Sequence, residues 1–237
     1  MSTDNLIDQL TNDLEPVKRL ESPLRRLLRW LAVSSLCIVV GVFVMGLRHD
    51  LSNAIYSTSF WLETSLILAS AISASLLAFL LSVPGRTVKK IKLAPSLCIA
   101  LWGLTILVLS LRKDVDSSHL AQLTNGMPCM SAIYSMAVIP GALLFAMICN
   151  AAPLNKPLVG IWAVIAAAAF GALGLQFVCA SSNPIHLIIW HVLPVLAIGV
   201  VGIYLGKLVF NWDNKTCLLY TSPSPRDATL SRMPSSA

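Results

Sequence analysis

Two cysteines and two histidines of this 237-residue chain could react or bind a metal, and they lie at the borders of its long apolar runs. Cys129 lies in the stretch LTNGMPCMSAIY, at the start of one such run, and Cys179 ends the next. His186 and His191 follow soon afterwards. Thiolates are nucleophiles and bind soft metals, and imidazoles bind many of the same metals. The chain has no Cys-x-x-Cys motif, which argues against a membrane thiol oxidoreductase.

The composition of the chain defines the setting in which these groups act. Apolar residues make up 56% of the sequence, charged residues 12%, and the mean hydropathy is +0.76. Charged residues make up about 25% of ordinary soluble domains. The sequence is therefore that of an integral membrane protein. Its first 24 residues are polar and acidic and show no cleavable signal, so the chain's own helices are expected to insert it.

Six apolar runs have the length of about 20 residues that spans roughly 30 Å of hydrocarbon. They cover residues 28–47, 60–83, 93–111, 129–150, 158–179 and 186–210. Six spans place both termini on one side, where twelve basic residues flank them, against three in the opposite loops. The twelve are Lys18, Arg19, Arg25, Arg26, Arg29, Arg86, Lys89, Lys90, Lys92, Lys156, Lys207 and Lys215; the three are Arg48, Arg112 and Lys113. The positive-inside rule thus predicts cytoplasmic termini and an outward-facing Cys129.

The short loop AAPLNKP joins the fourth and fifth runs, and Cys129 and Cys179 are equally far in sequence from its middle. Two antiparallel helices of about 22 residues joined so tightly bring their far ends to the same height. Both thiols are therefore expected at the outer surface on neighbouring helices. Close packing is favoured by small residues at every fourth position of the fifth run, namely Ala163, Ala167 and Gly171.

Residues 1–22 form a separate acidic segment before the first span. Its apolar residues recur at helical spacing, at Leu6, Ile7, Leu10, Leu14 and Val17. Acidic residues, among them Asp8 and Asp13, lie off this stripe, and no basic residue precedes Lys18. Anionic lipid repels such a helix, so the stripe is expected to dock on a basic groove of a protein. A solvated leader without a specific partner is the alternative.

The end of the chain, residues 217–237, does not read as protein sequence. Back-translated, Cys217 to Asp227 and Ser231 to Ala237 resemble the transposase adaptor and flow-cell sequence of a sequencing library. Residues 228–230 fall where the variable index of such a library lies. The segment is therefore expected to be an artefact without function. A genuine Pro/Ser-rich flexible tail is the alternative.

Several short motifs occur in an order that resembles the NrsF family of bacterial membrane anti-sigma factors, over roughly residues 4–212. These motifs are DNLIDQL and LEPVKRLESPLRR near the N-terminus, GLRHDL after the first span, FWLE and LSVPGR at the ends of the second, the cysteine after NGMP, and a cysteine followed by IIWHVLPVL. Two positions depart from the family pattern, because His49 and Ala180 stand where the family commonly has proline. The resemblance implies an anti-sigma factor that holds an extracytoplasmic-function sigma factor at the inner membrane.

The resemblance also assigns the sensing of an outward stimulus to Cys129 and Cys179. Cys129 opens a helix, where free N–H groups and the helix dipole stabilise a thiolate, with Asn125 as a candidate cap and Pro128 suited to the first turn. Cys179 ends a helix, so Cys129 is predicted to react first and Cys179 to resolve it. The product is either a disulfide or a jointly bound soft metal ion. Alternatively, both cysteines merely pack as small apolar residues.

His186 and His191 are candidate auxiliary sensing residues near the outer face. Histidines five positions apart on an α-helix point about 140° from each other, so at most one is expected to join the two thiols. The remaining membrane cysteines, Cys37, Cys98 and Cys149, are interpreted as structural. The first two lie within spans, and the third lies at the reducing inner surface.

The second span carries an acid, Glu63, in its first turn near the outer interface. An ionisable group in a membrane helix is usually partnered. Arg48 is the first candidate partner, with Arg112 and His191 as alternatives. A structural ion pair is favoured over a proton relay.

The sequence thus predicts an all-α membrane protein of the bacterial inner membrane with six transmembrane helices, both termini cytoplasmic, preceded by a short amphipathic cytoplasmic helix. Residues 1–27 would bind the sigma factor, residues 28–212 would form the transmembrane domain, and residues 213–237 the tail. Catalysis, a required cofactor and direct contact with nucleic acid are not expected, and the oligomeric state stays open. A small multi-helix transporter of an ion or solute is the alternative, although no charged residue lies at midplane depth.

Overall fold

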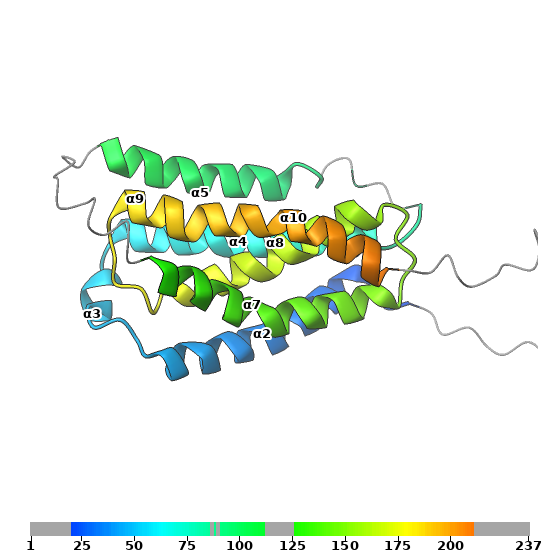
Figure 1. Ribbon diagram of the computed structural model, residues 1–237, viewed down its shortest axis with the longest axis horizontal. Coiled ribbons are helices and arrows are strands. Elements are labelled where there is room, and N and C mark those ends of the chain that lie inside the picture. The colour runs from blue at the N-terminus through cyan, green and yellow to red at the C-terminus, as the bar shows by residue number, and fades with distance from the viewer. Residues whose placement is uncertain (1–19, 86–87, 89–90, 112–125, 211–237) are drawn as a thin grey trace, which may run out of the picture.

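The computed structural model describes residues 20–85, 88, 91–111 and 126–210, and within these ranges the protein is all-helical (Figure 1). Six spans are long and apolar enough to cross a membrane, as predicted. They are α2 (Pro23–Met45), α4 (Thr58–Leu81), α5 (Ala94–Leu111), α7 (Met127–Cys149), α8 (Lys156–Leu175) and a final span, Pro184–Val209. The final span consists of α9 (Pro184–Leu187), the π-helix η1 (Ile188–Val192) and α10 (Leu193–Val209). A short helix, α3 (Leu51–Ala54), lies between α2 and α4.

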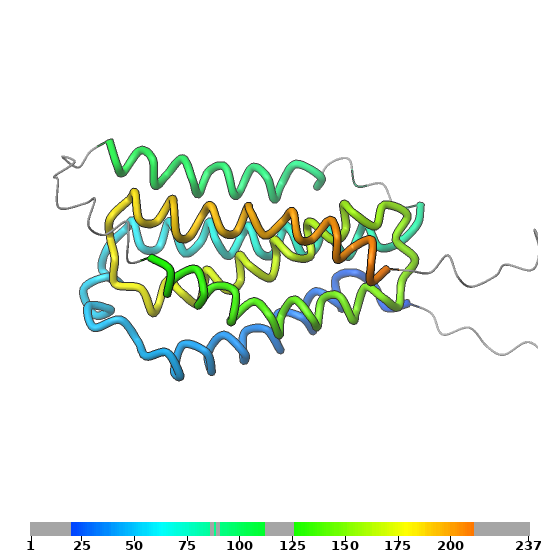
Figure 2. Tube along the Cα trace, viewed as in Figure 1, coloured from blue at the N-terminus to red at the C-terminus, as the bar shows by residue number. Residues whose placement is uncertain are grey.

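The six spans run roughly along the long axis of an elongated bundle (Figures 1 and 2). The start of α2 and the end of α10 lie at one end of the bundle, on the right of Figure 1. The start of α7, α3 and α9 lie together at the opposite end. This arrangement agrees with an even number of spans. Which end faces the cytoplasm stays a prediction from the basic residues.

Helix α8 lies at the centre of the bundle and packs against α4, α7 and α10. Its sequence permits this position because it is rich in alanine and glycine, which let neighbouring backbones approach. A Cβ added to Gly160 would lie 2.1 Å from the carbonyl oxygen of Gly202 on α10. Helices α8 and α10 therefore touch backbone to backbone.

The predicted small-residue face of α8 packs against α7, as the hairpin argument requires. A Cβ added to Gly171 would lie 2.4 Å from the carbonyl oxygen of Ile133, and the Cβ of Ala167 lies 3.4 Å from the Cβ position of Gly141. Ala163 is fully buried. The two helices that follow and precede the loop at Leu154 are thus close neighbours along their length.

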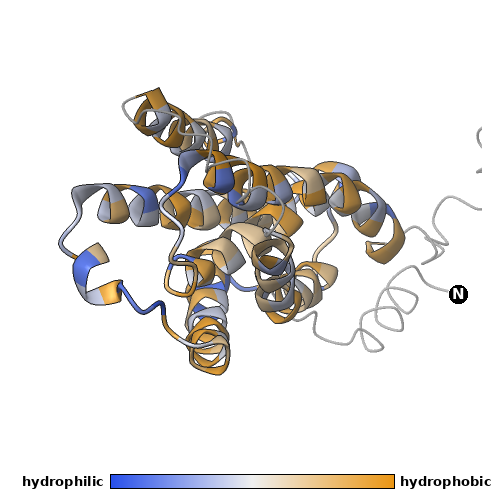
Figure 3. Ribbon diagram, turned by 60° about the vertical axis from the view of Figure 1, so that its left-hand side comes forward, coloured by the Kyte–Doolittle hydropathy of each residue, from blue (hydrophilic) through white to orange (hydrophobic). Residues whose placement is uncertain are grey.

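The outer helices present apolar side chains on the surface, as a bilayer requires. Large exposed residues of α2 include Leu36, Phe43 and Val44, and those of α5 include Leu104 and Leu111. Figure 3 shows hydrophobic residues along the helices and hydrophilic ones in connections such as that around α3. A soluble protein rarely exposes so continuous an apolar surface. The described fold is that of a multi-pass membrane protein.

Two span boundaries differ from the sequence prediction. Helix α2 begins at Pro23 rather than near residue 28, because the Ser22 side chain accepts a hydrogen bond from the Arg25 N–H and proline suits the first turn. Helix α8 ends at Leu175, so Cys179 lies in the connection after the helix rather than at its last turn. The predicted amphipathic helix falls largely on residues 1–19, which lie outside the described residues.

Candidate functional site

Cys129 and Cys179 lie together at one end of the bundle, as the hairpin argument predicts. The basic residues predict that this end faces outward, so it is called the outer end and the opposite one the inner end. Their sulfur atoms are 3.7 Å apart although 50 residues separate them in sequence. Cys129 occupies the first turn of α7, and Cys179 lies in the connection between α8 and α9. Both thiols are free and partly buried. At this separation one thiol donates a hydrogen bond to the other sulfur.

The start of α7 is fixed by close packing rather than by a polar cap. Pro128 lies in the first turn, as predicted, but the N-cap position is Gly126, which has no side-chain cap. A Cβ added to Gly126 would lie 2.1 Å from the ring of Trp190 on η1. The glycine of the NGMP motif therefore lets the indole pack against the turn that carries Cys129. Asn125, the predicted cap, lies outside the described residues.

Both histidines join the two thiols, so the prediction that at most one would do so is wrong. The Nε2 atom of His186 lies 3.5 Å from the Cys129 sulfur and 3.8 Å from the Cys179 sulfur. His191 is 1% exposed, and its ring lies 5.7 Å from that of His186, centroid to centroid. Ligand atoms of all four side chains lie within 4.8 Å of one another.

The reason for this error is the π-helix η1, which no periodicity argument anticipated. In a π-helix the backbone bonds i→i+5, so residues five positions apart return to nearly the same face. Pro194 accounts for the wider turn, because its ring would clash with the carbonyl of Trp190 in a continuous α-helix. His186 and His191 thus point to one cluster instead of opposite sides of a helix.

The contacts of Cys179 favour its thiolate. The hydrogen bond from the Cys129 thiol lowers the pKa of Cys179, and the neighbouring His186 and His191 lower it further. Burial works in the opposite direction but is a smaller effect than the hydrogen bond from Cys129. The order in which the two thiols react, with Cys129 first, stays a prediction.

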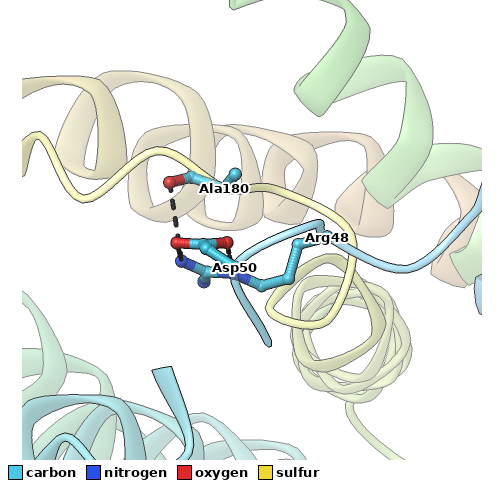
Figure 4. Close-up of polar contacts among 3 residues, drawn as sticks. All are labelled: Arg48, Asp50 and Ala180. Atoms are coloured by element: carbon cyan, nitrogen blue, oxygen red, sulfur yellow. Dashed lines mark hydrogen bonds and ion pairs between the residues drawn. The ribbon is translucent and has the colours of Figure 1, made fainter. Parts of the chain in front are cut away.

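Arg48 holds the connection that carries Cys179 through contacts on both sides of that residue, and Figure 4 shows its guanidinium with Asp50 and Ala180. Its backbone N–H donates to the Phe177 carbonyl at 3.0 Å, and its guanidinium donates to the Ala180 carbonyl at 3.5 Å. The same guanidinium binds the Asp50 carboxylate through two hydrogen bonds of 2.7 and 2.8 Å. The hydrogen bond from Arg48 lowers the pKa of Asp50 from 3.8 to about 2. The GLRHDL motif therefore positions the connection that carries Cys179.

The predicted ion pair between Glu63 and Arg48 stays a prediction. Arg48 also pairs with Asp50, two residues away, through a bidentate contact. Glu63 is buried at the start of α4 and accepts a hydrogen bond of 3.4 Å from the Gln176 amide. Sequence reasoning overlooked Asp50, although its spacing from Arg48 was the available signal.

A cavity of about 290 Å³ adjoins the cluster at the outer end of the bundle. Cys179 and His191 form part of its wall, and Arg48, Asp50 and Glu63 supply its charged groups. The remaining lining comes from the connection before α4, the end of α5 and the connection after α8. The cavity therefore joins the thiol–imidazole cluster to the loops of the outer end.

The opposite end of α7 makes a different polar contact, which the sequence reasoning did not foresee. Arg26 of α2 is 3% exposed and donates to the Met147 carbonyl in the last turn of α7. It also donates to the Ser82 hydroxyl at 3.2 Å and lies 4.6 Å above the centre of the Phe79 ring. Sequence reasoning used Arg26 only to orient the protein. The charge is in fact buried where α2, α4 and α7 meet.

The predicted partner-binding residues, Leu6, Ile7, Asp8, Leu10, Asp13, Leu14 and Val17, lie outside the described residues.

Comparisons with known proteins agree on one family. The profile described as "NrsF: Negative regulator of sigma F" matches residues 10–212. A curated protein of Azospira oryzae named "Probable anti-sigma-F factor NrsF" is similar, with 23% identity over 215 residues, which is 90% of this chain and 100% of that protein. No solved structure matches the chain.

Proposed function

This chain belongs to the NrsF family of negative regulators of sigma F, and from that premise we propose that it holds an extracytoplasmic-function sigma factor at the inner membrane and releases it when the outward-facing cysteine pair changes state. The family supports an anti-sigma factor with a sigma factor as its partner. The type of sigma factor, the membrane and the stimulus are the proposed parts.

The observation that carries the sensing half is the 3.7 Å contact between Cys129 and Cys179. Two thiols from positions 50 residues apart are thus close enough to react or to bind an ion together. Oxidation would join them by one S–S bond, with loss of two protons and transfer of two electrons to an external oxidant of the disulfide class. Binding of a soft cation would instead displace their protons. Either change alters the distance between α7 and the connection after α8.

The inhibitory half rests on the sequence of residues 1–27. The acidic amphipathic stripe would cover a basic surface that the sigma factor needs for polymerase or promoter DNA. Helix α2 begins at Pro23, directly after the acidic residues 1–22, and Arg26 connects its first turn to the last turn of α7. Cys129 lies in the first turn of that same helix α7. A shift of α7 would therefore act on the base of the binding segment.

A reporter gene under a promoter of the held sigma factor tests the proposal in cells. The wild-type protein should repress the reporter and release it under oxidant or soft-metal stress. The variant with Cys129→Ser and Cys179→Ser should repress equally well but no longer release. Cys98→Ser is the matched control, because Cys98 lies within α5, away from the cluster. Release by the double variant at the wild-type dose would overturn the sensing half, and failure of the wild-type protein to bind any sigma factor would overturn the whole.

Helix α7 also offers a test of orientation, because it carries one cysteine at each end. Cys129 lies in its first turn and Cys149 is its last residue and exposed. An impermeant maleimide added to intact cells, with the other cysteines replaced by serine, should label Cys129 and spare Cys149. Labelling of Cys149 alone would show that the protein has the opposite orientation.

A further inference from the structure

The cluster of two thiols and two imidazoles has the dimensions of a tetrahedral metal site. Tetrahedral Zn²⁺ binds sulfur at about 2.3 Å and nitrogen at about 2.0–2.1 Å, so its donor atoms lie about 3.3–3.8 Å apart. The Cys129–Cys179, Cys129–His186 and Cys179–His186 donor atoms are 3.7, 3.5 and 3.8 Å apart. Three edges of the tetrahedron therefore already have the required lengths.

His191 supplies the fourth donor. Its ligand atom lies within 4.8 Å of the other three. The ring is 1% exposed, and its Nε2 atom makes no hydrogen bond to any described residue. A buried polar atom without a partner destabilises the fold, so a partner for this imidazole would be favourable.

Two features of the backbone position these donors, namely the π-helix η1 and the connection that carries Cys179. The π-helix η1 brings His191 to the same face as His186, and π-helical turns occur frequently at functional sites. Arg48 holds the carbonyls of Phe177 and Ala180 on either side of Cys179. Metal ligands are usually supported by such outer contacts.

The adjoining cavity provides a route for a cation. It reaches the cluster at Cys179 and His191, and the Glu63 carboxylate lines its wall. Asp50 and Arg48 line it too and form an ion pair with each other. The lining thus holds two carboxyl groups and one guanidinium, a balance that favours entry of a cation over that of an anion.

We propose that Cys129, Cys179, His186 and His191 form one tetrahedral site for a divalent d¹⁰ cation of the Zn²⁺ and Cd²⁺ class. Two sulfur and two nitrogen donors in tetrahedral arrangement favour Zn²⁺, and thiolates also favour softer cations of the same charge. The inference rests on the proposed function, since it names the ligand of the same outer cluster. It adds that the imidazoles, and not the thiols alone, decide which ion is recognised.

The test uses the full chain, reduced and reconstituted in lipid nanodiscs, with Co²⁺ as the spectroscopic probe. Tetrahedral thiolate-bound Co²⁺ absorbs strongly in the visible and near ultraviolet, whereas octahedral Co²⁺ does not. One equivalent of Co²⁺ should produce these bands, and one equivalent of Zn²⁺ should remove them. An octahedral spectrum, or the absence of binding, would overturn the proposal.

Single variants then assign the ligands. His186→Ala and His191→Ala should each weaken Zn²⁺ binding by at least about tenfold. The matched control is His49→Ala, because His49 is exposed in the same outer loops but outside the cluster. Equal affinity in wild type and both histidine variants would remove the imidazoles from the site. Protection of Cys129 and Cys179 from maleimide by Zn²⁺ in the wild-type protein is an independent measurement, because it does not depend on the folding of a variant. Lack of protection counts against the site.

The results separate this inference from the proposed function. If the histidine variants bind Zn²⁺ as tightly as wild type while the cysteine double variant abolishes release in cells, the proposed cysteine sensor is supported and the four-ligand site is refuted. If all four residues bind the ion but the double variant still releases its partner, the metal site is supported and its role in sensing is refuted.

Discussion

The two ends of α7 differ in the kind of contact that holds them. At the outer end, Cys129 touches Cys179 and His186 through sulfur contacts of 3.5–3.7 Å between groups that gain or lose protons. At the inner end, the Met147 carbonyl accepts from Arg26, a group that stays charged at every physiological pH. Oxidation, protonation or metal binding can therefore change the contact at the outer end, whereas the hydrogen bond from Arg26 at the inner end is insensitive to them.

This difference indicates how one helix could carry a signal. A change of the contact at the outer end would shift the first turn of α7, and the contact with Arg26 at the inner end would pass the displacement to α2. Trp30 of α2 strengthens the second connection, because its indole N–H donates to the Pro140 carbonyl of α7 at 2.9 Å. Such coupling is a hypothesis until both ends are shown to bias the same equilibrium. Four experiments can test this contrast between the two ends of α7.

Removal of the inner contact should have the largest effect. Arg26→Ala leaves the Met147 carbonyl, in a helix end that has no intrahelical partners, without its donor. We expect the free energy of unfolding to fall by about 2–4 kcal/mol, measured by denaturation of the protein in detergent with tryptophan fluorescence. The control is Arg29→Ala, whose pair with Glu21 is exposed and should contribute less than about 1 kcal/mol. If both variants lost the same free energy of unfolding, the buried contacts of Arg26 would contribute no more than an exposed ion pair.

Overpacking at the outer end comes next. Gly126→Ala would place a Cβ 2.1 Å from the Trp190 ring, so the start of α7 must shift away from η1. Such overpacking typically costs about 1–3 kcal/mol, and it should also lower the yield of the Cys129–Cys179 disulfide. In Gly103→Ala on α5 the nearest atom is 4.0 Å away, so this control should be neutral or slightly stabilising. A stable Gly126→Ala protein with an intact thiol pair would contradict the close packing.

Removal of the Arg48 side chain should change the reactivity of Cys179 more than the stability of the fold. Arg48→Ala frees the Ala180 carbonyl and the Asp50 carboxylate, so Cys179 samples more positions. We expect the rate of disulfide formation with diamide to fall by about tenfold, followed by mass spectrometry. His49→Ala, at the exposed neighbouring position, should leave the rate unchanged. If the two variants react equally fast, the Arg48 side chain does not position Cys179.

The smallest effect is a dependence of stability on pH. The pKa of Asp50 is lowered to about 2 in the folded protein, from an ordinary value of 3.8. Its pair with Arg48 therefore stabilises the fold above about pH 4, and this contribution is lost as the pH falls towards 2. The difference in melting temperature between wild type and Asp50→Asn should shrink over that range. A difference that stays constant down to pH 2 would show that the ion pair contributes nothing.

The sequence was sufficient for the features that depend on length and symmetry. Hydropathy located the six spans, and the equal distance of Cys129 and Cys179 from one tight loop predicted their contact. What it missed depends on local backbone geometry or on a contact of two side chains. The π-helix before Pro194 moved His191 into the cluster, and Asp50 forms an ion pair with Arg48. Neither follows from an average periodicity.

The order of the chain gives the outer cluster an uneven division of its donors. Cys179, His186 and His191 all follow α8 within a short stretch that leads into α10, and α8 and α10 touch backbone to backbone at Gly160 and Gly202. Cys129 alone comes from α7. Three donors thus come from the segment between α8 and α10, and the fourth comes from the neighbouring helix. Joining the four donors would fasten the first turn of α7 to that segment, and separating them would release that turn alone.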